Sequence, residues 1–493
     1  MDKSTKYWLL TIFLLTLSLR LYLAFSIPNF TYESYFHLKQ VEHITETGLP
    51  LYQDGLSYGG RELLFLPFFH YFAAFFSLIF PLELAAKILP NLLMALLPFL
   101  VYLISRELTK NNTACLFSAF ISGFIPILFT VNSFSVTSLF LPLVFLAIYS
   151  FLRIEEKEYL YAYLVIFVIL SFTSSAAFLL IIGFLIYLLL SFIESKRVNE
   201  TERDAILFSI FFYIWSQFLF FKQVLIEQGI SFIWQNVPSE IIQQYFPKTP
   251  LFQALILVSV IPLIAGIYTV YKSLFKLKNQ KAFLIISLAI STTVLTWFRL
   301  IRYKVSLAFF GIVLALLFSL FYQDLAEYLR KTKLARFGRA TIIAIILLLS
   351  ISMIPTAISV AFQQDVPSNE DLQIFHWLKD NVEEDSTVLV LLEEGHLLTY
   401  ASGKKNFMDD QFYLIPDVEE RFNDLNLIFT TSFQTQAIDL LNKNKIDYIV
   451  LTKRAKDAHD LARFKYIDPS CFERVHKGEI KVYKVKCVIE EIG

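Results

Sequence analysis

Three basic residues in the stretch WFRLIRYKVS, residues 297–306, have types and spacing that suit phosphate binding. Arg299, Arg302 and Lys304 lie close together between two apolar runs. Guanidinium groups offer paired N–H donors that match two phosphate oxygens, and an ammonium group adds a compact positive charge. The same cluster can also be explained by basic side chains that reach toward lipid headgroups at the end of a membrane span, so both interpretations stay open.

The acidic residue Glu33 stands in FTYESYFHLKQVEHITETGLP, shortly after the first apolar run. A carboxylate there is suited to take the proton from an attacking hydroxyl group, or to help hold a divalent cation such as Mg²⁺ or Mn²⁺. The alternative is structural, because the segment is amphipathic and an early glutamate is favourable beside the N-terminal dipole of a helix. His37 and His43 do not have the i, i+4 spacing of a zinc-binding helix, so they do not predict a metal site.

The stretch SYGGRE, residues 57–62, places Arg61 directly after two glycines. Glycines let the backbone come close to an anion that a guanidinium group also binds, although a plain turn explains the stretch equally well. The sequence has no glycine-rich phosphate loop ending in Lys-Ser or Lys-Thr, and no Gly-x-Ser-x-Gly nucleophile elbow. ATP-driven transport and serine hydrolase chemistry therefore lose support.

The composition indicates the elements that must position these residues. The chain has 493 residues, of which 56% are hydrophobic and only 17% are charged, against roughly 25% charged residues in soluble domains. Apolar runs recur along the first three quarters of the chain, and about eleven of them approach the roughly 20 residues that cross a bilayer. We therefore predict a polytopic α-helical membrane protein. The predicted spans lie near residues 7–26, 86–107, 112–130, 136–153, 158–173, 175–193, 205–222, 251–274, 282–298, 305–323 and 340–363.

Basic clusters predict the orientation of these spans. SRELTK, SKRVNETER, KLKNQK and YLRKTKLARFGR fall between alternate spans, which makes those loops cytoplasmic by the positive-inside rule. The N-terminus is then cytoplasmic, and everything after residue 364 is extracytoplasmic at the cell membrane. The apolar segment 63–80 breaks this alternation, so we predict a helix in or dipping into the outer leaflet, with an ordinary span as the competing interpretation. The net charge of zero gives no indication of nucleic-acid binding.

The composition after residue 363 is that of a soluble domain. An amphipathic helical pattern in VPSNEDLQIFHWLKDNVEEDS leads into TVLVLL, and IDYIVL follows the helical TQAIDLLNKNK. Strands alternating with helices predict a small α/β domain. We therefore divide the chain into a transmembrane domain, 1–363, whose first outer loop is 27–85, and an extracytoplasmic α/β domain, 364–493. A second long outer loop covers 223–250. Cys471 and Cys487 form either a disulfide or two free thiols.

Taken in order along the chain, these features resemble the GT-C class of membrane glycosyltransferases, and within it the catalytic subunit of oligosaccharyltransferase. Glu33 in YESY stands where that family has its first-loop catalytic acid, and Arg302 in LIRYK stands where it has an arginine against the phosphate of the donor. Arg61 resembles the Gly-Arg of the family's first loop. The resemblance implies a sugar donor linked to a dolichyl- or undecaprenyl-type polyprenyl phosphate, held among membrane lipids.

The departures from the family narrow the expected reaction. The loop after the third span reads FTVNSFSVTS, so the family's second acidic motif is missing, and with it part of a site for Mg²⁺ or Mn²⁺. The family's Trp-Trp-Asp-Tyr-Gly motif falls at LLEEGHLLTY, which keeps neither tryptophan but places Glu393, Glu394 and His396 on the acceptor side, or on a plain surface turn. We predict an inverting sugar transfer to an acceptor hydroxyl. The alternatives are a non-catalytic scaffold subunit and a flippase or transporter of a lipid-linked sugar.

Overall fold

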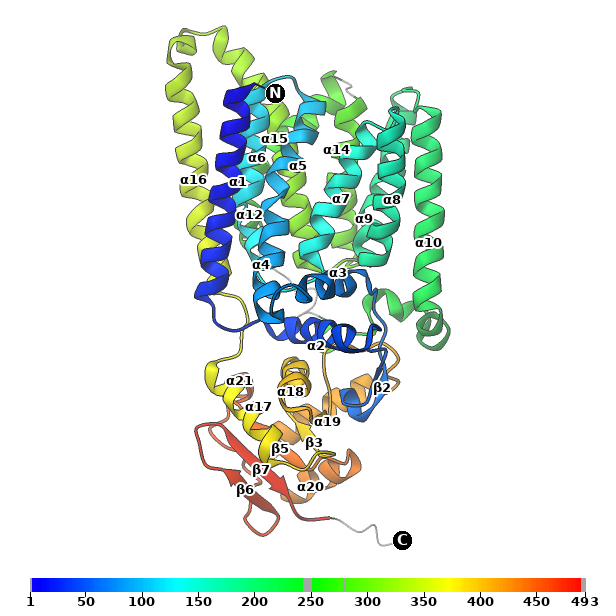
Figure 1. Ribbon diagram of the computed structural model, residues 1–493, viewed down its shortest axis with the longest axis vertical. Helices are drawn as coiled ribbons and strands as arrows, with labels where there is room; N and C mark the ends of the chain where they lie inside the picture. The colour runs from blue at the N-terminus through cyan, green and yellow to red at the C-terminus, as the bar shows by residue number, and fades with distance from the viewer. Residues whose placement is uncertain (1, 243–250, 278–279, 489–493) are drawn as a thin grey trace. The chain divides into compact units, whose positions relative to one another are not determined.

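The computed structural model describes residues 2–242, 251–277 and 280–488 (Figure 1). The chain divides into two compact units. The helical unit comprises Met1–Pro28, Leu66–Phe220 and Tyr245–Gln364, and the α/β unit comprises Asn29–Phe65, Phe221–Gln244 and Asp365–Gly493. Contacts therefore group residues 29–65 with the C-terminal residues and not with the apolar helices. The last eight residues of the predicted second outer loop, 243–250, lie outside the described residues, as do residues 278–279 of the basic cluster KLKNQK.

Helices lie in each of the predicted membrane ranges. Seven helices among the described residues are long and apolar enough to cross a membrane, or up to eight if a pair bent by 89° at Ser259 counts as one span, so the number eleven stays a prediction. In chain order the unit contains α1 (Lys3–Ser26), α3 (Phe68–Ser77), α4 (Leu82–Ala95), α5 (Leu97–Leu108), α6 (Asn112–Phe124), η2 (Pro126–Val131), α7 (Thr137–Leu152), α8 (Lys157–Thr173), η3 (Ser175–Ala177), α9 (Phe178–Ile193), α10 (Glu200–Gln228, which continues into the α/β unit), α12 (Leu251–Val258), α13 (Val260–Lys272), η5 (Ser273–Leu277), α14 (Gln280–Trp297), α15 (Tyr303–Arg330), η6 (Lys333–Phe337) and α16 (Gly338–Phe362).

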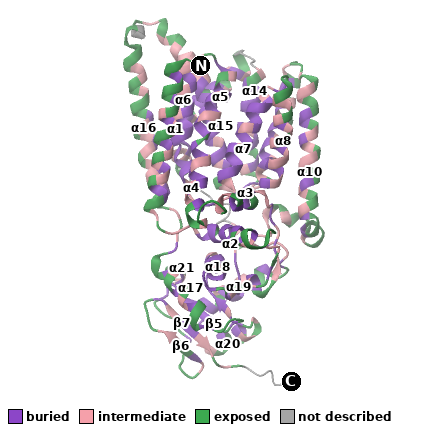
Figure 2. Cartoon of the chain, in the orientation of Figure 1, coloured by how far each residue is buried: buried purple, intermediate pink, exposed green. Residues whose placement is uncertain are grey.

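The core of the helical unit lies around α15 and α14, whereas α16 leaves most of its surface exposed (Figure 2). Two helices approach closely at Gly183 of α9: an added Cβ atom would lie 2.5 Å from the Leu288 side chain of α14, so that side chain would have to move. Helix α3 has ten residues. At 1.5 Å per residue it is about half as long as the roughly 30 Å core of a bilayer, and this length favours the prediction that segment 63–80 does not cross.

Arg20 of α1 faces the interior of the helical unit. Its side chain is 1% exposed and donates a hydrogen bond to the Leu128 carbonyl oxygen over 2.8 Å, while the guanidinium lies 4.6 Å from the centre of the Phe129 ring. Both partners belong to η2, whose last three residues begin the stretch FTVNSFSVTS. Arg20 therefore fixes that turn against α1.

The α/β unit is built on a mixed sheet of five strands in the order β4-β3-β5-β7-β6. β3 pairs in parallel with β4 and β5, and β7 pairs antiparallel with β5 and β6. The two predicted strands are β3 and β5, and the two predicted helices are α17 and α20, so the predicted α/β domain is confirmed. The strands are β3 (Thr387–Leu389), β4 (Lys405–Asn406), β5 (Tyr448–Leu451), β6 (Phe472–His476) and β7 (Lys481–Val485).

Helices and two loops surround this sheet. Cys471, before β6, forms a disulfide with Cys487, after β7, which decides between the two alternatives that the sequence left open. The remaining elements are α2 (Tyr32–Thr47), β1 (Gln53–Asp54), η1 (Ser57–Gly59), β2 (Arg61–Glu62), η4 (Gly229–Trp234), α17 (Asn369–Asn381), η7 (Leu392–Glu394), α18 (Gly395–Ser402), α19 (Val418–Thr430), α20 (Gln434–Lys443) and α21 (Lys453–His459).

Candidate functional site

The predicted phosphate-binding cations gather at the start of α15 in the helical unit. Arg302 is the N-cap residue of this 28-residue helix, and Lys304 lies in its first turn. Arg299 stands in the connection from α14, with a left-handed backbone (φ 55°). The N-terminus of a long helix carries a partial positive charge and unpaired N–H groups, which favour an anion. The fold therefore adds the N-terminus of α15 to the three basic side chains as a feature that favours an anion.

Glu33 lies in the first turn of α2, in the α/β unit, and its side chain is exposed. The rest of α2 packs on α18: Phe36 meets the ring of His396 at 5.1 Å between centroids, and Tyr35 meets Tyr400 at 5.6 Å. The position at the helix start agrees with the structural interpretation of Glu33 and leaves its carboxylate accessible for chemistry. The contacts that hold α18 in place therefore also position α2 and, with it, Glu33.

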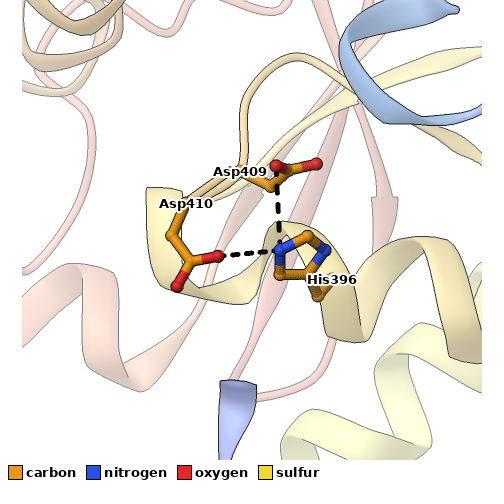
Figure 3. A group of neighbouring side chains, drawn as sticks. All are labelled: His396, Asp409 and Asp410. Atoms are coloured by element: carbon orange, nitrogen blue, oxygen red, sulfur yellow. Dashed lines mark hydrogen bonds and ion pairs between the residues drawn. The ribbon is translucent and has the colours of Figure 1, made fainter. Parts of the chain in front are cut away.

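A buried group of three titratable side chains anchors α18 (Figure 3). The Nε2 atom of His396 lies 2.8 Å from Asp410 Oδ1 and 3.7 Å from Asp409 Oδ1. His396 and Asp409 are almost fully buried, and the side chain of Asp410 is 18% exposed. The three side chains thus join the start of α18 to the loop after β4.

Arg61 of β2 completes this group. Its Nη2 atom lies 2.9 Å from Asp409 Oδ1 and its Nε donates to Ser57 Oγ over 2.7 Å, while Nη1 donates to the Gln411 carbonyl oxygen. The Arg61 side chain is only 6% exposed. As a phosphate ligand Arg61 stays a prediction, but the protein itself uses most of the N–H donors that a phosphate would need.

The Asp409 carboxylate accepts four hydrogen bonds. Besides Arg61, Oδ1 accepts from the Gln411 backbone N–H at 3.1 Å, and Oδ2 accepts from Ser57 Oγ at 2.6 Å and from Asn406 Nδ2 at 3.0 Å. Burial alone would raise the pKa of Asp409, but His396, Arg61 and these donors outweigh it and lower the pKa to about 2. Burial likewise opposes protonation of His396, yet Asp409 and Asp410 raise its pKa above the ordinary value.

Gly395 explains why one residue of LLEEGHLLTY cannot vary freely. A Cβ atom at this position would lie 2.4 Å from the Met408 carbonyl oxygen and 2.7 Å from Asp409 Cβ. Real Cβ atoms do not approach backbone so closely, so only glycine lets the start of α18 lie against the loop that carries Asp409.

The two glutamates before Gly395 have different surroundings. Glu393 is half-buried, with Oε1 3.8 Å from Arg454 Nη2. Glu394 is fully buried, and its Oε2 accepts from the Leu391 backbone N–H at 3.2 Å. Burial, reinforced by the nearby Asp371, raises the pKa of Glu394 to about 8. Glu394 is therefore mostly neutral at pH 7, which the sequence did not predict.

The predicted site residues divide between the two units. Arg299, Arg302 and Lys304 belong to the helical unit, whereas Glu33, Arg61, Glu393, Glu394 and His396 belong to the α/β unit. Asp409 and Asp410 are not among the residues predicted from the sequence to act at the site. The available signal was an Asp-Asp pair shortly after a strand and near a predicted histidine, but nothing in the linear pattern connects it to Arg61, 348 residues away.

His396, Asp409 and Asp410 are compatible with a divalent cation by ligand type, and their ligand atoms lie within 4.8 Å of one another. The geometry fits a metal less well. The four hydrogen bonds to Asp409 occupy the lone pairs that a carboxylate offers, and the Arg61 guanidinium already supplies a positive charge beside it. A requirement for Mg²⁺ or Mn²⁺ therefore stays a prediction, and no step of the mechanism is derived from it.

Comparison with known proteins finds one matching family and several similar solved structures. Residues 66–219 match a family described as dolichyl-phosphate-mannose-protein mannosyltransferase. The oligosaccharyltransferase AglB of Archaeoglobus fulgidus, in complex with an inhibitory peptide and a dolichol-phosphate, is 13% identical with a TM-score of 0.68, covering 91% of this chain and 70% of that chain. The same protein in complex with Zn and sulfate gives 14% identity, a TM-score of 0.62 and coverage of 88% and 67%.

A second fold relative spans the whole chain. ArnT of Cupriavidus metallidurans, bound to undecaprenyl phosphate, is 11% identical with a TM-score of 0.55, and the match covers 98% of both chains. No curated protein sequence matches the chain. The chain therefore has the fold of the GT-C class of membrane glycosyltransferases and resembles oligosaccharyltransferase within that class.

Proposed function

We propose that the protein is a membrane glycosyltransferase that moves a sugar from a polyprenyl-phosphate-linked donor to an acceptor hydroxyl on the extracytoplasmic face. The observation that carries the proposal is that two fold relatives were solved with a polyprenyl phosphate, dolichol-phosphate in AglB and undecaprenyl phosphate in ArnT. The matched family, named for a dolichyl-phosphate-linked sugar, supports the same class of donor. The identity of the sugar and the length of the lipid are not part of the proposal.

Arg302, with Arg299 and Lys304, binds the phosphate of the donor at the start of α15. Negative charge develops on the phosphate oxygens as the bond between the sugar C1 atom and the bridging phosphate oxygen breaks. Fixed cations and a helix N-terminus stabilise that charge more strongly in the transition state than in the bound donor, which is the requirement for catalysis. Arg302 is the N-cap residue of that helix.

Glu33 acts as the general base. The acceptor hydroxyl oxygen attacks C1 from the face opposite the phosphate, its proton passes to the Glu33 carboxylate, and the lipid phosphate leaves with the electron pair of the broken bond. The configuration at C1 is then inverted. The proposal requires that a donor held at Arg302 of the helical unit comes within reach of Glu33 of the α/β unit.

The group formed by Arg61, Asp409 and His396 positions the helix that carries Glu33. Arg61 binds Asp409, Asp409 lies beside His396, and His396 packs against Phe36 of α2. Arg61 thereby has a positioning role in this proposal, and its role as a phosphate ligand stays a prediction. The disulfide between Cys471 and Cys487 supports an extracytoplasmic location for the unit, because such bonds persist in oxidising compartments.

The test is transfer of a radiolabelled sugar from polyprenyl phosphate to acceptor in proteoliposomes. Glu33→Gln is expected to lower kcat by about 100-fold or more, in line with general-base catalysis, while donor affinity stays unchanged. Arg302→Ala is expected to weaken donor binding and to lower kcat. Glu384→Gln, at an exposed acid elsewhere in the α/β unit, is the matched control. Full turnover by Glu33→Gln would remove the proposed base.

A non-catalytic subunit is the second candidate, because the loop FTVNSFSVTS has no acid where the resembled family has a pair. Such a scaffold would show no transfer with any acceptor, and Arg302→Ala would leave binding of the donor lipid unchanged. A flippase would retain Arg302-dependent binding and would move the lipid between leaflets without breaking the sugar–phosphate bond. The three candidate functions are therefore separated by Arg302→Ala together with three measurements: sugar transfer, donor-lipid binding and lipid movement between leaflets.

A further inference from the structure

A cavity of about 770 Å³ opens in the α/β unit and has no role in the mechanism above. Its wall comes from the start of α2, from α17, from η7 and from α19 and α21. The residues that line the cavity include Tyr32, Asp371, Glu393, Phe422, Lys453 and Arg454. The volume lies within the range of about 300–1,000 Å³ that is typical of small-molecule sites.

Two acidic side chains that the mechanism does not use, Asp371 and Glu393, line this cavity. Asp371 is 4% exposed, and its Oδ2 accepts from the backbone N–H and the hydroxyl of Ser368, at 2.9 and 2.7 Å. The side chain of Glu393 is 34% exposed. Carboxylates accept hydrogen bonds, so the cavity is suited to an occupant that donates them.

The charges around the cavity argue for a neutral occupant. Arg454 forms an ion pair with Asp365, lies 3.8 Å from Glu393 Oε1 and covers the ring of Tyr32 at 4.9 Å. Lys453 is exposed beside it. A cationic ligand would face these two basic residues, and an anionic ligand would face Asp371 and Glu393. Hydroxyl groups satisfy both kinds of neighbour, because each one donates to a carboxylate and accepts from a cation.

The remaining lining is aromatic and aliphatic. Tyr32 and Phe422 are joined by Leu391, Leu392 and Leu425. A sugar ring has a polar rim of hydroxyl groups and an apolar face of C–H groups, so it needs both carboxylate acceptors and an apolar surface. Small-molecule sites combine an apolar lining with a few placed polar groups in this way.

We propose that this cavity binds a neutral carbohydrate. The inference rests on the proposed function and deepens it, because it places a carbohydrate, either the acceptor glycan or the sugar of the donor, beside the helix that carries Glu33. Tyr32 lines the cavity and directly precedes Glu33 in α2. A sugar in the cavity therefore lies at the end of the helix that presents the general base. The carbohydrate has two sources to distinguish, the acceptor glycan and the sugar of the lipid-linked donor.

The test measures binding to the full-length protein in detergent by equilibrium dialysis. The probes are radiolabelled glucose, mannose, N-acetylglucosamine and their disaccharides, with an acidic and a basic hexapeptide as competitors. At least one neutral sugar is expected to bind and to resist both peptides. Glu393→Gln and Lys453→Met are each expected to weaken that binding about tenfold. Lys453 is exposed, so its variant tests the site without disturbing the core.

Matched controls lie outside the cavity: Glu384→Gln and Lys477→Met replace exposed residues of the same types and are expected to leave sugar binding unchanged. Absence of binding by every neutral sugar would overturn the proposal, as would equal binding by the cavity and control variants or displacement by either peptide. Loss of free-sugar binding with unchanged donor-lipid binding identifies the acceptor glycan as the occupant. Weakened binding of the donor lipid in the same variants identifies the donor sugar.

The outcomes also separate this inference from the proposed function. If sugar binding is absent while transfer still depends on Glu33, only the carbohydrate cavity is wrong. If a neutral sugar binds at the cavity while no transfer occurs in proteoliposomes, only the transferase function is wrong.

Discussion

Two acidic side chains of the α/β unit, Asp409 and Glu394, are equally buried and titrate in opposite directions. Both are 0% exposed. The pKa of Asp409 falls from its ordinary 3.8 to about 2, whereas the pKa of Glu394 rises from its ordinary 4.5 to about 8. Burial by itself raises both values, since it disfavours the charged form. The difference therefore comes from the groups that surround each carboxylate.

Asp409 has four hydrogen-bond donors and two cationic neighbours, Arg61 and His396. Glu394 accepts from the Leu391 N–H, has one oxygen without a partner and lies near another acid, Asp371. The first environment holds a fixed charge that ties the Arg61 loop to α18. The environment of Glu394 keeps its carboxyl group mostly neutral, directly after Glu393 of the cavity lining.

Asp409→Asn should break the first environment and give the largest effect. It leaves the Arg61 guanidinium buried without its carboxylate, a situation that costs about 3–5 kcal/mol in other proteins. We expect the apparent Tm of the α/β unit to fall strongly in thermal unfolding followed by circular dichroism in detergent. Asp385→Asn, at a surface acid, is the control with little expected change. A Tm equal to wild type would mean that Arg61 does not depend on Asp409.

Glu394→Gln should break the second environment through its pH dependence. A carboxyl whose pKa is raised in the folded state contributes fully to stability below its unfolded pKa, near 4.5, and loses that contribution as pH rises toward its folded pKa of about 8. The wild type should therefore lose up to about 1.4 kcal/mol per pH unit in this window relative to the glutamine variant.

The readout is the difference in unfolding free energy between wild type and Glu394→Gln at pH 5, 6, 7 and 8. His396 contributes its own loss of stability as pH rises above about 6.5, but it is present in both proteins and cancels in the difference. A difference that does not vary with pH would mean that Glu394 is ionised in the folded protein.

The sequence predicted the elements better than the contacts between them. Hydropathy located the apolar helices, and alternating patterns located β3 and β5, because both signals are local and periodic. The same signals could not assign residues 29–65 to the α/β unit, since that grouping depends on packing between segments that are far apart in the chain.

For the site, the sequence selected residues but not their roles. Arg61 and His396 were named from their motifs. The motifs did not indicate that the Arg61 guanidinium binds Asp409. Asp409 and Glu394 look alike in a sequence, where neither burial nor partners are visible. The predicted cations at Arg302 stand at a helix N-terminus, and this context follows from local structure that the sequence does indicate.

Gly395→Ala tests whether the environments of Asp409 and Glu394 are coupled through Gly395. Gly395 follows Glu394 directly and lies against the backbone of Asp409. Because the nearest atoms to an added Cβ are backbone, the loop must shift, with an expected cost of about 1–3 kcal/mol. Gly338→Ala, where a Cβ meets nothing within 4 Å, is the control. The pH-dependent difference assigned to Glu394 should shrink in the same variant, and an unchanged difference would show that the two environments are independent.

Asp410→Asn is expected to give the smallest effect and to sharpen the assignment of the proton on His396. Asp409 and Asp410 both raise the pKa of His396 against burial, and Asp410 does so through the 2.8 Å hydrogen bond to Nε2. Its side chain is partly exposed, so its loss should cost only about 1 kcal/mol. The pKa of His396 should fall, measured by NMR on ¹⁵N-histidine protein, with His396→Gln identifying the signal. If the pKa does not move, Asp409 alone holds the proton on His396, and the ion pair with Arg61 must then leave enough negative charge on Asp409 to do so.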